Sequence, residues 1–425
     1  MPSTSFDIES LKLLLSKWLP TKESLYKFYI KNFLLIGLIC AILISFSFPV
    51  PGCYLSKITV GTLHIRIFSF LASCLLFFFN GLTLKTSDIK SLYPKKYYFM
   101  YGLLCINFLT TLISLIMIQL PLVPHQFSIG LAIFTTVPSS LASGVAIAIA
   151  SKADVPLAIL LTVIPNLIGA FTVPALLKLY LTHISGISID IESLLLQLVL
   201  CILIPVSVGM LLRASYSSVG VFAKRHRIGL RMFANICLLF IICLTLSASR
   251  DDLIAQSSLN IFYIFIIILI QYGMFLIVNF VLTVYVFGFP IESAVTLTIM
   301  TSQKSAPVAL AVISSFTTDL KLLGLLAVPC IIGQIVQIFI GSLLAPYFAR
   351  CVGRMKPPPP PPRLISLGID HPTPDGKGNL TPDSSHTSGS DDTCGMCRHM
   401  VPSRDLMADE SAWPVVGLSN EEGNL

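Results

Sequence analysis

The sequence has little charge for its length, and this scarcity argues against a soluble globular protein. Asp, Glu, Lys and Arg make up 12% of the 425 residues, whereas 55% are hydrophobic and the mean hydropathy is +0.85. A soluble domain carries about 25% charged residues. The formal net charge is +7, but the basic residues lie between hydrophobic runs rather than in one patch. The sequence therefore predicts a protein of the lipid bilayer, with no nucleic-acid partner.

Signals for secretion, disulfide bonding and catalysis are also missing. Most of the 11 cysteines lie inside hydrophobic runs, where Cys behaves as a small apolar residue, so we expect no disulfide framework. Residues 1–31 have no small-residue cleavage site and no Arg, so we expect neither a cleavable signal nor a transit peptide. The apolar runs hold no paired carboxylates and no His-Glu-x-x-His motif. We therefore expect no enzyme, no metal centre and no cofactor, with a sodium ion as the one possible exception.

The sequence has instead a series of long apolar runs. A helix needs about 20 predominantly apolar residues to cross a bilayer. Ten runs approach that length, at residues 32–49, 66–84, 98–120, 128–150, 156–178, 193–213, 230–249, 258–286, 290–315 and 321–347. The sequence thus predicts an all-α polytopic membrane protein with about ten transmembrane helices.

The flanking segments complete the predicted organisation. Residues 1–31 form a cytoplasmic N-terminal segment, residues 32–349 the ten-span transporter domain, and residues 350–425 a disordered, Pro-rich cytoplasmic tail. Lys and Arg favour alternate loops by about four to one, which places both ends in the cytoplasm. The six prolines from Pro357 to Pro362 are either a docking segment for an SH3-like module or a stiff spacer.

Two of the apolar runs carry dense polar clusters around a proline. Residues 135–144 of the fourth run include Pro138, and residues 301–307 of the ninth include Pro307. Proline breaks or kinks a helix, and irregular backbone at this depth is tolerated only inside protein or beside a cavity. The clusters are five runs apart, so two five-helix halves would have opposite orientations. Such paired breaks in inverted repeats indicate a transporter binding site.

Lys304 lies in the second cluster and is the only charged residue between Glu292 and Asp319. At about 1.5 Å per residue these flanking charges are roughly 18 and 22 Å away, so the ammonium cannot easily reach an interface. A charge at the bilayer centre costs at least about 2.5–3.5 kcal/mol. We therefore expect Lys304 to face a partner or a polar cavity, unless the break shifts it toward an interface. The candidate substrate-binding residues are Lys304, Gln303, Ser302 and Ser140, with half-helix N-termini as further donors to an anion.

Weaker candidates lie in two other runs. Thr162 and Asn166 are four residues apart and share one helix face, and Asn107 lies near the middle of the third run. Each alone is more often a contact between helices than a ligand. Together with the two breaks they could line one site, whereas Gln271 and Asn279 are interpreted as structural.

This arrangement resembles the bile acid:sodium symporter superfamily, or solute carrier family 10, over roughly residues 30–350. Residues 137–145 are similar to its crossing motif in span four, and residues 81–85 to its motif at the end of span two. Residues 302–305 and 307–310 are similar to span nine of the member-seven branch, which has plant plastid and fungal relatives. The resemblance implies crossing broken helices in spans four and nine.

The resemblance implies only part of a sodium site. The positions that match sodium ligands of the family are Asn107, Ser143, Thr162, Asn166 and Gln303. Gly144 stands where an Asn usually follows, the ligand Glu falls near Ile299, and Lys304 replaces a neutral polar residue. Either sodium binds weakly through neutral oxygens, or Lys304 supplies the positive charge and transport is proton-coupled or uncoupled. Electrostatics favours the second.

The predicted function is secondary active transport of a small organic anion or metabolite by alternating access, with sodium coupling as one option. The alternative is a regulator of cellular calcium homeostasis, a role associated with the member-seven branch, acting through the tail. We expect the plasma membrane first, with secretory-pathway or plastid envelope membranes as alternatives. The sequence does not identify the substrate.

Overall fold

A computed structural model describes residues 22–60, 65–84, 95–140, 143–185, 191–316 and 319–355. These residues are mostly helical, with one short antiparallel pair of strands, β1 (Thr59–Val60) and β2 (Ile65–Arg66). The helices belong to one unit of the chain, Met1–Pro359. The first 21 residues and the tail after residue 355, with its proline run, lie outside the described residues.

Each of the ten apolar runs corresponds to a helical segment. In chain order these segments are α2 (Lys22–Ser47), α4 (Ile67–Thr83), α5 to α6 (Lys96–Leu104 to Ser114–Met117), α7 with α8 (Gln126–Thr136 and Ser143–Ala150), α9 (Val155–Ser185), α10 to α11 (Ile191–Leu198 to Ile204–Ser215), α13 (Arg227–Ala248), α15 (Ser258–Val281), α16 with α17 (Ile291–Ser302 and Ala306–Phe316), and α18 (Leu320–Met355). Six of the described segments are long and apolar enough to cross a membrane, and α2 with α3 (Pro49–Ser56), bent by 91°, is a seventh candidate. An all-α membrane protein is confirmed at this level.

Short elements complete the helical segments. The π-helical turns η2 (Cys105–Leu109), η4 (Val199–Leu203) and η5 (Leu282–Val286) continue α5, α10 and α15, and the 3-10 turn η3 (Thr110–Ile113) leads into α6. The short helices α12 (Ser217–Arg225) and α14 (Arg250–Ile254) connect longer ones. The π turns change which side chains and carbonyls face inward, and η2 does so next to the candidate site.

The two helix breaks are present where the proline clusters predict them. Helix α7 ends at Thr136, and the chain is extended at Val137, the residue before Pro138, as sterics before a proline favour. Helix α16 ends at Ser302, and α17 resumes at Ala306 after three non-helical residues. Pro307 is the second residue of α17, where a missing N–H costs no helical hydrogen bond.

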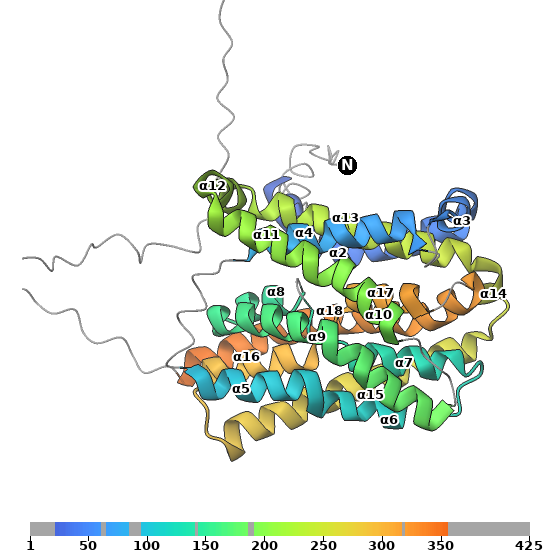
Figure 1. Cartoon of the computed structure of the whole chain (residues 1–425). Coiled ribbons are helices and arrows are strands. Elements are labelled where there is room, and N and C mark those ends of the chain that lie inside the picture. Colours follow the sequence, from blue (N-terminus) through green and yellow to red (C-terminus); the bar gives the residue numbers. More distant parts are fainter. Residues whose placement is uncertain are drawn as a thin grey trace, which may run out of the picture. The chain divides into compact units, whose positions relative to one another are not determined.

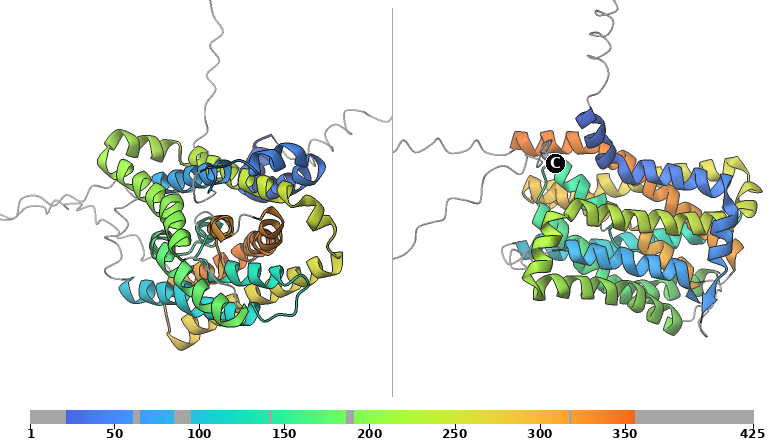
Figure 2. Two further views of the ribbon diagram at one scale, coloured as in Figure 1. Left: turned by 45° about the vertical axis from the view of Figure 1, so that its right-hand side comes forward. Right: turned by 90° about the horizontal axis from the view of Figure 1, so that it is seen from above.

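The helices pack in two groups, which we call the flat layer and the bundle. The flat layer consists of α2, α4, α11 and α13, which run side by side (Figures 1 and 2). In the bundle, α18 packs against α7, α8, α15 and α17, while α16 packs against α9 and α15. Helix α17 contacts α4 of the flat layer, and α18 contacts α2 and α13.

Glycines allow a close approach of α4 and α11 within the flat layer. A Cβ on Gly81 of α4 would collide with the backbone carbonyl of Val206 on α11. A Cβ on Gly209 of α11 would approach the carbonyl of Phe78 on α4 to 2.5 Å. The two helices therefore touch through backbone at both positions, as small residues permit in membrane helix pairs.

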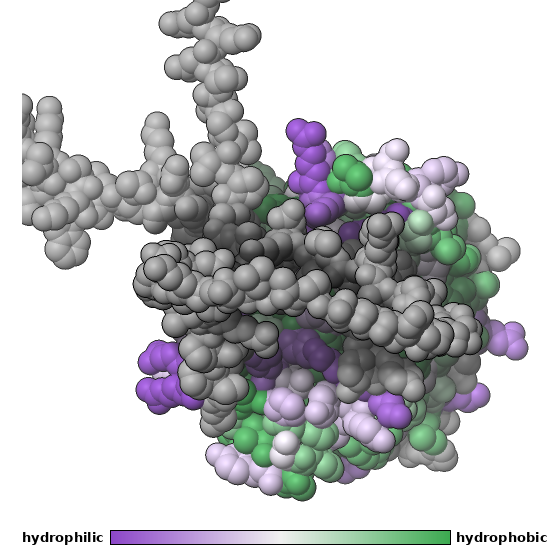
Figure 3. All heavy atoms as spheres, turned by 90° about the vertical axis from the view of Figure 1, so that its left-hand side faces the viewer, coloured by the Kyte–Doolittle hydropathy of each residue, from purple (hydrophilic) through white to green (hydrophobic). Residues whose placement is uncertain are grey.

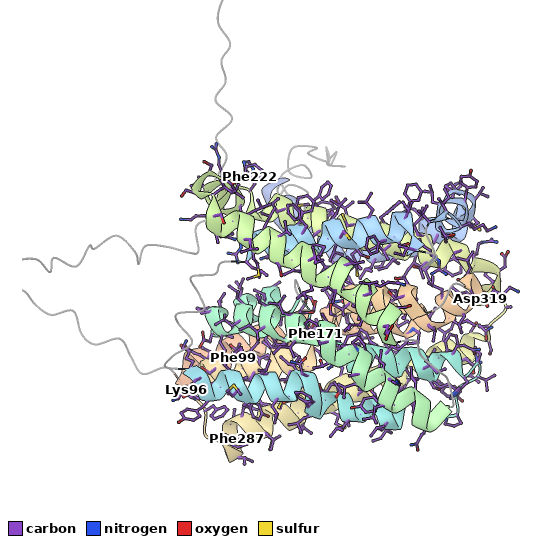
Figure 4. All side chains as sticks on the ribbon, viewed as in Figure 1. Lys96, Phe99, Phe171, Phe222, Phe287 and Asp319 are labelled. Carbon is purple, nitrogen blue, oxygen red and sulfur yellow. The ribbon has the colours of Figure 1, made fainter. Side chains whose placement is uncertain are left out.

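The labelled residues of Figure 4 mark the two ends of the helices. Lys96 and Phe222 lie at one end and Asp319 at the opposite end, with Phe171 between them (Figure 4). Figure 3 shows the end of the molecule that carries Lys96 and Phe222. Hydrophilic and hydrophobic side chains both appear on this face, and hydrophobic ones also lie along its edge. Large apolar side chains such as Leu43, Ile270 and Ile277 are more than half exposed. Such a surface fits lipid around the middle of the helices.

Candidate functional site

The two helix breaks meet in the interior of the protein. The backbone N–H of Ser305, in the second break, donates to the carbonyl of Pro138, in the first, at 3.0 Å. Ser139, Gln303 and Ser305 are fully buried, and Lys304 is 1% exposed. A site with polar groups from both breaks is therefore enclosed by protein, as irregular backbone at membrane depth requires.

Helix α9 holds the first break. Asn166 donates from Nδ2 to the carbonyls of Ser139 at 2.9 Å and Thr162 at 2.6 Å. The Ser139 hydroxyl donates to the carbonyl of Leu161 at 2.8 Å. That carbonyl lacks its usual helical donor because the residue four positions later is Pro165, which has no N–H. The proline in α9 thus provides the acceptor that fixes Ser139.

Helix α18 holds the second break through two glutamines. Gln337 accepts the N–H of Lys304 at its Oε1, at 2.9 Å, and Gln334 accepts the N–H of Ala306 at 3.2 Å. The two glutamines are three residues apart and therefore share one face of α18. They act as side-chain caps for backbone donors that the break leaves without helical partners.

Gln303 connects the two breaks with the surrounding helices. Its Oε1 lies 3.1 Å from the hydroxyl of Ser143, which also lies 2.7 Å from the hydroxyl of Ser140. Its Nε2 donates to the Tyr272 hydroxyl at 2.9 Å and to the Gln337 carbonyl at 3.1 Å. The Gln303 side chain therefore uses its acceptor and donors within the protein.

Lys304 extends from the second break toward the π turn η2. Its Nζ donates to Thr110 Oγ1 at 2.9 Å and lies 3.4 Å from the carbonyl of Ile106. In this turn the Thr110 N–H bonds to Cys105, five residues back, instead of to Ile106. Among the described residues, Lys304 has no carboxylate within 4.0 Å. The ammonium is thus held by neutral oxygens alone.

Three buried polar atoms near these contacts have no hydrogen-bond partner in the described structure. They are Asn107 Nδ2 in η2, Asn166 Oδ1 in α9 and the Ser305 hydroxyl. Buried polar groups are usually satisfied, so unpaired atoms point to water, an ion or a ligand at the site. The site therefore has spare hydrogen-bonding capacity on both sides of the crossing.

Hydrogen bonds join four of the predicted residues to the two breaks, namely Ser140, Ser143, Asn166 and Gln303. Within the described part of the chain, the side chains of Asn107 and Thr162 make no such contact with the other predicted residues. Ser302, Gln303 and Lys304 are enclosed in the bundle. Thr162 donates its hydroxyl to Ala158 within its own helix, and the Ile299 side chain is buried and apolar. The backbone donors proposed for an anion are partly occupied, since the N–H groups of residues 304–306 already have acceptors.

A pocket lies between the flat layer and the bundle, next to the crossing. Its polar lining consists of Asn80 of α4, Asn235 of α13, Gln334 of α18 and Ser140 of the first break. Its apolar lining consists of Leu34, Leu76, Ala234, Leu238 and Pro307. Its volume of about 20 Å³ is enough for about one water molecule. A metabolite can therefore bind here only if the two helix groups separate.

Sequence reasoning missed several residues of this site. Thr110, Tyr272, Gln334 and Gln337 all contact the breaks directly. The available signal was the pair of glutamines at a spacing of three in an otherwise apolar helix. Gln271, interpreted as structural, donates to the Thr135 hydroxyl at 2.7 Å and so ties α15 to α7.

Comparisons with known proteins agree with the motif resemblance. The model of the SBF-like CPA transporter family matches residues 32–350. A probable chloroplastic sodium/metabolite cotransporter of Arabidopsis thaliana is 28% identical over 335 residues, which cover 77% of this chain and 75% of the relative. Its counterpart in Oryza sativa subsp. indica is 27% identical over 327 residues, 75% of each chain. Sodium/bile acid cotransporter 7-A of Xenopus laevis is 26% identical over 324 residues, 74% of this chain and 91% of the relative. The resemblance to the member-seven branch and its plant relatives is confirmed.

Proposed function

The chain belongs to the SBF-like CPA transporter family, and we propose that it moves a small polar metabolite across a membrane by alternating access. The observation that carries this proposal is the crossing of two helix breaks beside a pocket that lies between two separately packed groups of helices. Movement of the flat layer against the bundle would open that pocket to one side of the membrane at a time. The relatives' names describe sodium/metabolite and sodium/bile acid cotransporters, which supports a transporter.

We propose ten spans for the described part of the chain. Six segments qualify by length and composition, and α2 bends at its end into α3. The two interrupted segments, α7 with α8 and α16 with α17, each cross the membrane once if their two helices are counted together. Helix α4 has 17 residues, or about 26 Å at 1.5 Å per residue, which is close to the roughly 30 Å hydrocarbon core.

The division into two helix groups supports inverted repeats. The flat layer contains the first, second, sixth and seventh segments, and the bundle contains the others. Each group therefore holds matched members of two five-helix halves. The helices that hydrogen-bond to the breaks match as well, because the fifth segment (α9) holds the first break and the tenth (α18) holds the second.

We further propose that both ends of the transporter domain face the cytoplasm. Lys96, at the start of α5, and Phe222, in the basic helix α12, mark one end of the helices, and Asp319 marks the other (Figure 4). The excess of Lys and Arg at the first end fits the positive-inside rule. The plasma membrane is our first proposal, and a plastid envelope membrane is the alternative, because the plant relatives' names describe those proteins as chloroplastic. The proposed calcium-regulator role rests on the tail, outside the described residues.

The pocket chemistry favours a substrate that is recognised by hydrogen bonds. Among the described residues its polar groups are three amides and one hydroxyl, and none of these lining residues is charged. Lys304 is not among them, and its ammonium points to Thr110 instead. A polar, uncharged solute fits these groups better than an organic anion does.

Uptake into proteoliposomes tests the transporter proposal. The purified full-length protein is incubated with a mixture of polar metabolites, and the solutes retained in the vesicles are identified by mass spectrometry. We expect Asn235→Ala and Asn80→Ala to reduce the uptake of any transported solute at least tenfold. The matched control is Asn260→Ala in α15, which is not among the pocket-lining residues. Equal uptake by empty vesicles, or equal loss with the control, would contradict the proposal.

A further inference from the structure

We propose that the ammonium group of Lys304 occupies the position of a bound cation in the bundle, so that the protein works without sodium at this site. The inference deepens the proposed transport function and rests on it for its meaning in a transport cycle. It goes against the sodium coupling that the relatives' names state for those proteins.

The contacts of the ammonium are those of a metal-like cation. Its donors meet the hydroxyl oxygen of Thr110 at 2.9 Å and the backbone carbonyl oxygen of Ile106 at 3.4 Å. Hard cations in proteins take hydroxyl, carbonyl and carboxylate oxygens of this kind. The Ile106 carbonyl is available because the π turn η2 directs the Thr110 N–H to Cys105 instead.

The surroundings offer a second cation neutral oxygens, such as Asn166 Oδ1, but no negative charge among the described residues. The described residues place no carboxylate within 4.0 Å of Lys304, and the nearby Ile299 side chain is buried and apolar. A sodium ion beside the ammonium would be repelled with no compensating negative charge, and burial strengthens this repulsion. One positive charge at this place therefore excludes another.

Hydrogen bonds to the backbone of Lys304 and to its neighbour Gln303 hold the residue in place. Its N–H is held by Gln337 of α18, and the preceding residue, Gln303, is bonded to Tyr272 and Gln337. The ammonium consequently ties the second break to η2 and η3 in the α5–α6 segment. A cation that arrived from solution would make the same connection only while bound, whereas Lys304 makes it permanently.

Removal of the side chain should expose an empty cation position. In Lys304→Ala, the Thr110 hydroxyl oxygen loses its donor, the Ile106 carbonyl keeps only the Thr110 hydroxyl at 3.3 Å, and the volume of the side chain becomes free. Sodium, or methylammonium as an analogue of the missing group, should then bind and stabilise the folded protein by mass action. The wild type should show no such response, because its position is already filled.

The experiment is thermal melting of the full-length protein in detergent, in sodium chloride, methylammonium chloride or choline chloride at equal ionic strength. We expect the same Tm for the wild type in all three salts. Lys304→Ala should melt lower in choline and regain about 2 °C or more, saturably, in sodium or methylammonium. Adding Thr110→Val to Lys304→Ala should remove the response. Lys224→Ala, which removes an exposed lysine of α12, is the matched control and should respond to none of the salts.

Two results would overturn the inference. One is a sodium-specific rise in the Tm of the wild type, which would show that a cation binds beside the lysine. The other is a Lys304→Ala variant whose Tm responds to neither sodium nor methylammonium. If Lys304→Ala does not fold, Lys304→Ser removes the same charge with a smaller apolar change, and the same two results apply. Melting needs no substrate, so failure here is separate from failure of the transport assay.

Discussion

Both helix breaks are held by side-chain hydrogen bonds from a neighbouring helix, but only one of them carries a charge. Each break is clamped by a long helix with an internal proline, α9 at the first and α18 at the second. At the first break the clamp donates to carbonyls, through Asn166. At the second it accepts from N–H groups, through Gln334 and Gln337. Only the second break contains a charged residue, Lys304.

This difference shows how one architecture can carry two kinds of chemistry. The backbone exposes carbonyls where α7 ends and N–H groups where α17 begins, so each clamp presents the complementary side-chain atom. The first break, with no charge of its own, contributes Ser140 to the pocket. The second break directs its charge away from the pocket, toward η2. We interpret the first as the part that meets solute and the second as the part that holds the bundle together.

The largest effect should come from removing the clamp of the second break. In Gln337→Leu the N–H of Lys304 stays buried without its acceptor, which costs about 1–3 kcal/mol, and the Gln337 link to Ser302 is lost as well. We expect a fall of several degrees in the Tm of the detergent-purified protein. Gln256→Leu, whose amide bonds to Asp252 outside the site, is the matched control and should change the Tm little. Equal shifts would show that the second break needs no clamp.

The same change at the first break should have a smaller effect. Asn166→Leu removes the donor to the carbonyls of Ser139 and Thr162. Carbonyls tolerate the loss of one partner better than N–H groups do, so we expect about 1–2 kcal/mol, less than for Gln337→Leu. Urea or thermal unfolding of both variants side by side measures the difference. A larger loss for Asn166→Leu would reverse the proposed roles of the two breaks.

A double-mutant cycle tests how Pro165 positions Ser139. In Pro165→Ala the new N–H can bond to the carbonyl of Leu161, the acceptor of the Ser139 hydroxyl. Ser139→Ala should therefore destabilise the wild type by about 0.5–1.5 kcal/mol but the Pro165→Ala protein much less. Pro329→Ala in α18 is the control background, in which Ser139→Ala should keep its full effect. Additive changes in the Pro165→Ala background would mean that the missing N–H has no bearing on the first break.

Much of the architecture could be predicted because it depends on local chemistry. Long apolar runs specify the helices, and Pro138 and Pro307 specify the two breaks, since no other backbone feature is needed to interrupt a helix there. Its lone charge predicted that Lys304 faces a polar partner, and the Thr110 hydroxyl is one. These predictions required no knowledge of which helices touch.

The rest could not be predicted because it depends on helix packing. Gln334, Gln337, Tyr272 and Thr110 become part of the site only through the rotation of their helices against the breaks. The π turn at residues 105–109 contains neither Pro nor Gly, so no residue in the sequence predicted it. That turn decides which carbonyl faces Lys304, and hence whether the lysine meets oxygen or apolar side chains.

The smallest effect should come from an ion pair at the end of the bundle, whose carboxylate also joins the two broken segments. Asp154, between α8 and α9, pairs with Lys95 at 2.5 Å, and the Ser293 hydroxyl at the start of α16 lies 3.3 Å from the same carboxylate. The Lys95 side chain is 35% exposed and the Asp154 side chain 5%, so salt screens the pair only in part, and Lys95→Met should cost about 1 kcal/mol. Asp154→Ala should cost more, because Ser293 and the N–H of Leu157 lose an acceptor too. Melting at low and high salt separates these contributions: the Lys95→Met difference should shrink with salt, and the additional Asp154→Ala loss should not. If both losses disappear in salt, the hydrogen bonds of Asp154 do not join the broken segments, and the bundle depends on the central crossing alone.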